Sequence, residues 1–530
     1  MHQILSKVAP HHLSGCYSDY FSYICNTIKK NLKSMKRTLL AVIGLLLAIE
    51  GYSAVTTPAV CPEPQRYEIS RTEYLPFESL SIVCSDIAAQ DWAKSHLKQW
   101  YGKFAPQVSG AKGKTAMMGE EEYRIKIDKG GVKVTAKSLQ GVRYALYTLR
   151  QLAIPSRGTE KVEGWIVPKS EIEDKPEMGF RGMHLCWFRE TKAWEIERQI
   201  RLAAYYKFNY VVIESWGAYR SKVAPWWGWR DGEMTIKEIK RLKAIADDLG
   251  VTLIPQLNIF GHATLARHGT GKHAALDLKP EYQPYFEPLA GWNWCLSNPK
   301  TKILHKALIK EMYEVFGCPP YFHIGCDEAS APSCPECVKS SYSTLFADYV
   351  KEISSYVKSL GAKSLMWHDM LLDKGEGKWE YAKGTKETAS LLRELPRDII
   401  ICDWYYRKPL ESYPSLDHFK ALGFEVLTCP WDNNKGTLSL LSYAHKLGLK
   451  GVLGTLWHHN HGRWLLDIYF LVANRAWNSD SSLAVYGSIY NNHYAIHTHL
   501  RHIGWDMKNK NPRHAGVFYD ELPPEPYQTW

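Results

Sequence analysis

From residue 180 onward, short apolar segments alternate with longer segments in which apolar residues recur every three or four positions. The short segments are typical of buried strands and the longer ones of amphipathic helices. Strands are predicted at 182–187, 210–214, 252–257, 321–325, 364–368, 399–404, 425–428 and 451–457. Helices are predicted at 194–206, 236–249, 342–360, 416–422, 438–447 and 464–477. The alternation predicts an α/β fold with a (β/α)8 TIM barrel. A doubly wound sheet is the alternative, but the sequence lacks the glycine-rich phosphate turn that such a sheet would need.

A different pattern precedes the barrel. Residues 122–134 alternate around Asp128-Lys-Gly-Gly131, which is typical of a hairpin, and residues 139–152 follow the helical period. These features predict a small α/β domain. A charged segment with two prolines, 168–176, is interpreted as a linker. The predicted divisions are therefore an extension (1–54), the small domain (55–172), the barrel (173–480), and a C-terminal helix with a packed tail (481–530).

The N-terminal extension resembles a secretory signal. Met35-Lys36-Arg37 is followed by an apolar stretch at 39–49 and then by Tyr52-Ser53-Ala54, so we expect translation to begin at Met35. The apolar stretch is too short to cross a bilayer comfortably. The sequence therefore predicts a secreted or periplasmic protein without stable membrane insertion.

Composition places the chain among ordinary globular proteins, with 23% charged and 45% hydrophobic residues. The net charge is +11, but residues 1–54 contain six Lys or Arg against two acids, so removing them leaves +7. The remaining basic residues are scattered and form no dense run. This distribution argues against a nucleic-acid groove, and no nucleic-acid partner is expected.

Acids and aromatic residues recur where the predicted strands end, which is where a barrel of this kind carries its chemistry. Asp327 and Glu328 follow the apolar stretch 321–325, and acids there can exchange protons with a ligand. The alternative is that they only begin a loop or cap a helix. The other strand ends carry Cys186, Glu214, His262, Trp367, Asp369, Trp404, Tyr406, Asp432, Trp457 and His459. The chain has 20 Trp, and such rings can bind the apolar faces of sugars, although core packing is the better explanation for any single one.

Several of these stretches together resemble glycoside hydrolase family 20, the β-N-acetylhexosaminidases. The matching stretches are Arg181-Gly182, Ile254-Pro255 with Phe260-Gly261-His262, His323 to Glu328, Trp367-His368-Asp369, Gly454 to Trp457, and 141–152. The resemblance implies an exo-acting hydrolase that removes terminal β-linked N-acetylhexosamine from a glycan, with retention and without a cofactor or metal. In this family the sugar's own 2-acetamido oxygen attacks the anomeric carbon.

The resemblance also implies roles by position. Glu328 is expected to protonate the leaving oxygen and then deprotonate water, while Asp327 grips the acetamido N–H. The neighbouring negative charge is expected to favour a protonated Glu328. The substrate-binding set implied is Arg181 at the ring hydroxyls, Trp367, Trp404 and Trp457 around the acetamido group, Tyr406 or Tyr405 at its oxygen, His262 and Glu214 behind the acids, and Asp369, Asp432 and His459. Asp369 would either orient the acetamido group or bond a loop backbone.

Two departures from the family pattern leave alternatives open. Cys186 stands where the family often has Asp, and His459 where it often has Glu. A catalytically impaired carbohydrate-binding protein on the same scaffold is one alternative, and a barrel glycosidase that uses Glu214 with Glu328 is another. A cluster of His458, His459, His461 and Arg463 suggests a sulfated or otherwise anionic sugar.

Cys334-Pro-Glu-Cys337 is a tight cysteine pair. It fits a metal half-site, a redox pair or a local disulfide, and a zinc site needs two further ligands that the spacing does not reveal.

Overall fold

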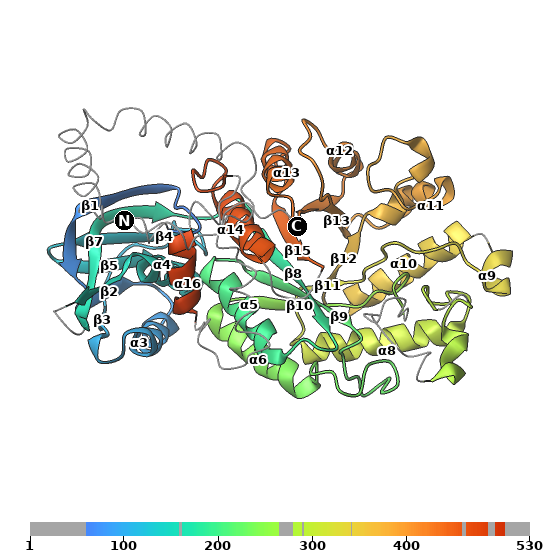
Figure 1. Cartoon of the computed structure of the whole chain (residues 1–530), viewed down its shortest axis with the longest axis horizontal. Coiled ribbons are helices and arrows are strands. Elements are labelled where there is room, and N and C mark those ends of the chain that lie inside the picture. The colour runs from blue at the N-terminus through green and yellow to red at the C-terminus, as the bar shows by residue number, and fades with distance from the viewer. Residues whose placement is uncertain are drawn as a thin grey trace, which may run out of the picture. The chain divides into compact units, whose positions relative to one another are not determined.

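The computed structural model describes residues 60–157, 162–263, 279–288, 291–340, 342–457, 463–485 and 493–503 (Figure 1). The predicted signal peptide and most of the predicted C-terminal tail lie outside these residues. Among the described helices, none combines the length and apolar character needed to cross a bilayer.

Eight parallel strands close into a barrel in which β8 and β15 are neighbours (Figure 1). The strands are β8 (Phe180–Phe188), β9 (Tyr210–Trp216), β10 (Thr252–Gln256), β11 (Tyr321–His323), β12 (Lys363–Trp367), β13 (Ile400–Trp404), β14 (Glu425–Cys429) and β15 (Gly451–Leu456). All eight predicted strands are present, with small shifts at their ends. The predicted TIM barrel is therefore confirmed.

The predicted helices around the barrel are also present. They are α5 (Ala193–Tyr205), α6 (Ile236–Leu249), α10 (Tyr342–Ser359), α12 (Pro414–Ala421), α13 (Asn434–Lys446) and α14 (Arg463–Trp477). The structure adds α8 (Pro299–Val315), which the prediction left out. Its start carries a readable signal, because Asn298 caps it by accepting the Lys300 N–H and Pro299 occupies the first turn.

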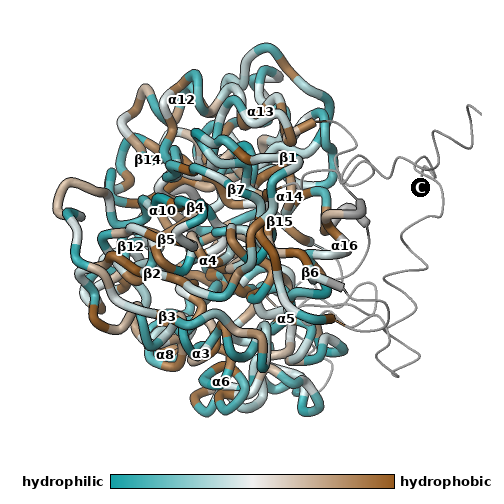
Figure 2. Tube along the Cα trace, turned by 90° about the vertical axis from the view of Figure 1, so that its left-hand side faces the viewer, coloured by the Kyte–Doolittle hydropathy of each residue, from teal (hydrophilic) through white to brown (hydrophobic). Residues whose placement is uncertain are grey.

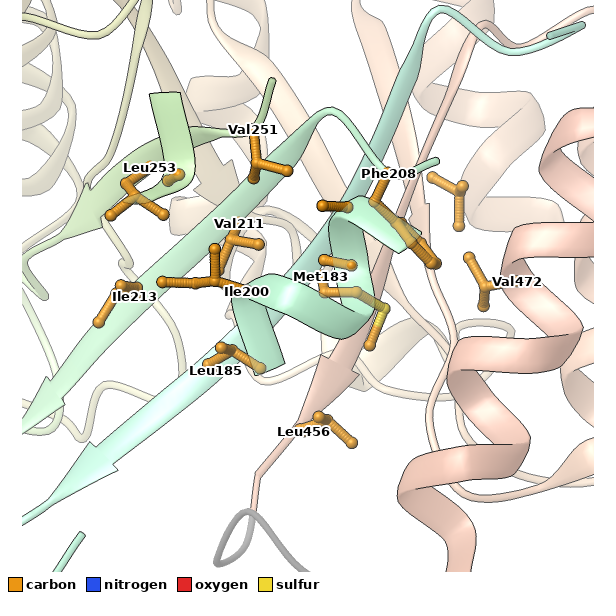
Figure 3. Packing of buried hydrophobic residues seen from close by; sticks show 14 of the residues in the cluster. Met183, Leu185, Ile200, Phe208, Val211, Ile213, Val251, Leu253, Leu456 and Val472 are labelled. Atoms are coloured by element: carbon orange, nitrogen blue, oxygen red, sulfur yellow. The ribbon is translucent and has the colours of Figure 1, made fainter. Parts of the chain in front are cut away.

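Strand alternation decides which side chains enter the barrel, because successive residues point to opposite faces. On β9, Val211 and Ile213 pack in the outer layer, while Val212 packs in the interior. Figure 3 shows the outer layer, where these two residues lie beside Ile200 of α5. In Figure 2, β15 is largely hydrophobic, whereas α6 alternates between hydrophobic and hydrophilic positions. The same alternation places Trp367 in the barrel interior.

The small domain is a mixed sheet with the order β1-β7-β4-β5-β2-β3, and β6 pairs with β7. Its elements are β1 (Arg66–Pro76), β2 (Ser79–Val83), α3 (Ala88–Tyr101), β3 (Gln107–Gly110), β4 (Tyr123–Asp128), β5 (Gly131–Ala136), α4 (Leu139–Leu152), β6 (Ile154–Arg157) and β7 (Val162–Asp174). The predicted hairpin is β4 with β5, and the predicted helix is α4. A small α/β domain before the barrel is therefore confirmed.

The predicted linker at 168–176 is wrong, because residues as far as Asp174 belong to β7. Buried and less buried positions alternate along this segment, as expected of a strand. Pro168 is tolerated because it pairs with Tyr74 beside a register shift in β1, where a missing N–H costs little. After the barrel, the chain forms α16 (His493–His502), where His502 Nδ1 lies 2.8 Å from the Tyr205 hydroxyl of α5.

Candidate active site

A tight turn after β11 positions the acidic pair. Gly325, Cys326 and Glu328 all have positive φ, at 67°, 77° and 47°. At Gly325 a Cβ would approach Asn258 Oδ1 to 2.0 Å, so only glycine fits there. A positive φ is strained for Cys and Glu, and such strain concentrates at functional sites.

Asp327 and Glu328 both contact one imidazole. His262 Nε2 lies 3.2 Å from Asp327 Oδ2 and 3.4 Å from Glu328 Oε2. The Asp327 side chain is 7% exposed and that of Glu328 is 37% exposed. Lys383 Nζ lies 3.3 Å from the other Glu328 oxygen. The pair therefore divides into a buried carboxylate and a more accessible one.

The protonation of Glu328 differs from the expectation. The hydrogen bond from His262, reinforced by the charge of Lys383, lowers the pKa of Glu328 to about 2. The sequence predicted the opposite direction, because it took account of the neighbouring Asp327 and not of Lys383. Without a ligand, the carboxyl of Glu328 is ionised.

The backbone of Glu328 is fixed on two sides. Asp369, which begins a 3-10 turn (Asp369–Leu371) after β12, accepts the Glu328 N–H at 2.8 Å. The Trp292 indole donates to the Glu328 carbonyl at 2.7 Å. Burial and the charge of Asp327 raise the pKa of Asp369 well above its usual value. Of the two roles considered for Asp369, the structure shows the bond to the loop backbone.

Glu214 lies in a polar network inside the barrel. Its side chain is 2% exposed, Oε2 lies 2.9 Å from His184 Nε2, and Oε1 accepts the Asn258 amide at 2.9 Å. Cys186 is fully buried, with its sulfur 3.9 Å from Glu214 Oε2. Because Glu214 is buried and both of its carboxylate oxygens are already bonded, it is suited to holding His184 and Asn258 in place and poorly suited to act as a nucleophile. Cys186 belongs to the same interior network.

Trp367, Trp404, Trp457 and Tyr406 come together from the ends of three strands, and we call them the aromatic wall. The rings of Trp367 and Trp457 lie 5.3 Å apart, and Trp404 stacks on Tyr406 at 5.0 Å and 13°. The Trp457 indole donates to the Tyr406 hydroxyl at 2.8 Å. Burial raises the pKa of Tyr406 well above its usual value.

Arg181 does not belong to this site, so its predicted role at the ring hydroxyls is wrong. It is the second residue of β8, at the amino end of the strand, and faces outward from the barrel. Its guanidinium donates to the carbonyls of Met178 and Lys207, to the Tyr144 hydroxyl and to the Glu121 carboxylate. Because its side chain faces outward and lies at the amino end of the strand, Arg181 cannot reach a site at the carboxyl ends of the strands.

The remaining predicted residues are Asp432 and His459. Asp432 follows β14 and is exposed. His459, together with His458 and His461, lies outside the described residues. The anionic-sugar prediction that rests on them stays a prediction.

Sequence reasoning missed Lys383, Trp292 and Tyr381. Tyr381 extends the aromatic wall, with its ring 4.7 Å from that of Trp404. All three come from long segments between strands and helices instead of from strand ends. The Trp292-Asn-Trp294 sequence was the one visible signal for these three residues, because it places two Trp in a predicted loop.

Two family models match the chain. "Glycosyl hydrolase family 20, domain 2" matches residues 57–175, and "Glycosyl hydrolase family 20, catalytic domain" matches residues 209–432. The chain belongs to glycoside hydrolase family 20. The two models fall on the small domain and on most of the barrel, and the resemblance drawn from the sequence is confirmed.

Among curated relatives of this family-20 chain, the β-hexosaminidase of Vibrio furnissii is 24% identical over 338 residues, covering 55% of this chain and 53% of the relative. A lacto-N-biosidase of Bifidobacterium bifidum is 24% identical over 403 residues, covering 68% and 33%. The chain therefore spans about half or less of these relatives' lengths. A solved exo-β-N-acetylglucosaminidase of Vibrio harveyi shares the fold, with a TM-score of 0.63, 18% identity, and coverage of 84% of this chain and 77% of that one.

Proposed function

We propose that this protein is an exo-acting β-N-acetylhexosaminidase that cleaves with retention, the substrate's acetamido oxygen acting as the nucleophile. The observation that carries the proposal is the division of the acidic pair. Asp327 is buried and Glu328 is accessible, and both contact His262. A mechanism in which the substrate supplies the nucleophile needs one enzymic acid for the proton and another group for the acetamido N–H.

Glu328 would act as the general acid and then as the general base. It is ionised in the absence of a ligand, so it must first gain a proton. A sugar that covers Glu328 removes water from it, which raises the pKa of a carboxyl. His262, at 3.4 Å, is placed to pass a proton to it. Glu328 would then give this proton to the leaving oxygen and later take one from water.

Asp327 would hold the acetamido group from one side and Tyr406 from the other. Asp327 Oδ1 is buried and has no hydrogen-bond partner among the described residues, so it is available to accept the acetamido N–H. The Tyr406 hydroxyl accepts the Trp457 indole proton and would donate its own proton to the acetamido oxygen. The negative charge of Asp327 would stabilise the oxazolinium-like intermediate.

The test compares an aryl β-N-acetylglucosaminide with the matching aryl β-glucoside. We expect the β-N-acetylglucosaminide to be cleaved and the β-glucoside to be cleaved much more slowly, because the glucoside lacks the acetamido oxygen that acts as the nucleophile. Glu328→Gln should lower kcat by about 10²–10⁴-fold. Glu394→Gln is the matched control, since this exposed acid pairs with Lys351 on the protein surface. Equal rates with and without the N-acetyl group would refute the proposal.

Two further results separate the alternatives. Glu328→Ala should keep more activity on a substrate with a highly acidic leaving group, because such a group needs no proton, whereas Asp327→Asn should lose activity on both substrates. Insensitivity to a thiazoline mimic of the intermediate would favour an enzymic nucleophile such as Glu214. Sugar binding without turnover in the parent would favour the carbohydrate-binding protein.

The secretory signal predicted at 35–54 supports a proposal that the enzyme acts outside the cytoplasm. Mass spectrometry of the mature cellular protein tests this, and an intact 36–54 segment would contradict it.

A further inference from the structure

Three cysteines from two separate loops lie close together. Cys334 and Cys337 flank the start of α9 (Pro335–Lys339), and Cys295 comes from a loop 39 residues before Cys334. The sulfur of Cys295 lies 3.7 Å from that of Cys334 and 3.8 Å from that of Cys337. One carboxylate oxygen of Glu287 completes a group whose ligand atoms all lie within 4.8 Å of one another.

These distances fit a tetrahedral metal site. A zinc–sulfur bond is about 2.3 Å, so two thiolates at corners of a regular tetrahedron around zinc lie about 3.8 Å apart. A disulfide needs about 2.05 Å and consumes two sulfurs, which would leave the third cysteine unused. All three cysteines are free thiols in the structure. Cys295, Cys337 and Glu287 are 5%, 1% and 4% exposed and Cys334 is half-buried, so an ion here would be largely shielded from water.

We propose that Cys295, Cys334 and Cys337 bind a structural zinc ion, with the Glu287 carboxylate as the fourth ligand. Soft thiolate ligands in a tetrahedral arrangement select zinc over magnesium or calcium. Four protein ligands close the coordination shell and leave no position for a substrate, so the site is structural and not catalytic. The sequence predicted no metal, because it showed only the Cys334–Cys337 half of the site.

The surrounding hydrogen bonds orient the proposed ligands. Glu287 Oε2 accepts the backbone N–H of Ser333 at 2.7 Å and that of Cys334 at 2.5 Å. These bonds fix the carboxylate beside the sulfurs, as outer bonds commonly do for metal ligands. The Cys337 thiol also lies 3.1 Å from the Ser297 hydroxyl.

The site would fasten together the two loops that hold Glu328. The Asn293 side chain donates to the Ser330 carbonyl at 2.8 Å and accepts the Ser330 N–H at 3.0 Å. Trp292, in the same loop, donates to the Glu328 carbonyl. Cys295 follows Asn293 and Cys334 follows Ser330 in the chain, so a shared zinc ion would link the two loops. This link would help to hold the strained backbone of Glu328 in place.

Metal analysis of the full chain tests the proposal without any assay of activity. Protein purified without chelator should contain about one zinc per chain. Cys295→Ser and Cys337→Ser should lose it, whereas Cys318→Ser, the matched control at an exposed free cysteine, should retain it. Glu287→Gln should bind zinc more weakly than the parent.

Cobalt substitution keeps the test decisive even if the cysteine variants do not fold. After zinc is removed from the parent by a chelator, added Co²⁺ should give the strong visible and thiolate charge-transfer bands of a tetrahedral thiolate complex. Zinc removal should also lower the Tm of the parent but not that of a folded Cys295→Ser variant. Parent protein without zinc and without these cobalt bands, or a disulfide at Cys295 in non-reducing peptide mapping, would overturn the proposal. Neither result bears on whether a sugar is cleaved.

Discussion

Substitution of Arg181 by methionine should destabilise the protein and leave sugar binding intact. The guanidinium is 2% exposed and donates to the Met178 and Lys207 carbonyls, to Tyr144 and to Glu121. Glu121 belongs to the small domain and Arg181 to the barrel, so the change removes a bond between the two domains. Methionine fills similar space but makes none of these bonds.

The size of the effect follows from the burial of the pair. Removing one partner of a buried ion pair costs about 3–5 kcal/mol. The Glu121 side chain is 25% exposed, so water can partly solvate it, and we take the lower value, about 3 kcal/mol. Unfolding entropy is about 2.1 cal/mol/K per residue, which gives about 0.8 kcal/mol/K for a cooperative unit of roughly 400 residues. The Tm should therefore fall by about 4 °C.

Calorimetry and initial-rate kinetics together check this prediction. Arg124→Met is the control, because Arg124 is 53% exposed and its contact with Glu173, at 3.5 Å, should contribute less than about 1 kcal/mol. For Arg181→Met, KM for an aryl β-N-acetylglucosaminide should stay at the parent value. A tenfold rise in KM with an unchanged Tm would refute the reasoning. That result would indicate that Arg181 binds the hydroxyl groups of the sugar ring.

Three further predictions concern the site and the barrel interior. Tyr406→Phe should lower kcat by about 10²–10³-fold with little change in Tm, because it removes a donor to the developing intermediate; a change in KM alone would contradict this. Trp457→Phe removes the hydrogen bond to Tyr406 at 2.8 Å and should cost about 1 kcal/mol, or about fivefold in kcat/KM; an equal loss in the Tyr406→Phe background would show that the two groups do not act together. Burial raises the pKa of Asp403 to about 7, so the folded state keeps a proton that the unfolded chain loses near pH 4, and stability should fall as pH rises between these values. Asp403→Asn cannot ionise, so its Tm relative to the parent should rise from pH 4 to pH 8, and parallel Tm curves would show that Asp403 does not titrate in this way.

The hydrophobic pattern by itself determined the barrel and most of its chemistry. Parallel strands in a barrel bring their carboxyl ends to one rim, so residues at strand ends, such as Trp367 and Trp457, meet although they are far apart in the chain. Strand periodicity then sends alternate residues inward. These two rules act locally along each strand, which is why a sequence can reveal them.

Only the tertiary structure decided which residues of the long connecting segments, and which face of each strand, belong to the candidate active site. Arg181 lies at the amino end of β8 on the outward face, so its motif context misled the prediction. Lys383 and Cys295 lie in segments whose paths depend on packing against the rest of the barrel. The pKa of Glu328 depends on the hydrogen bond from His262 and on Lys383, whose Nζ lies 3.3 Å from the carboxylate, and no spacing along the chain encodes that distance.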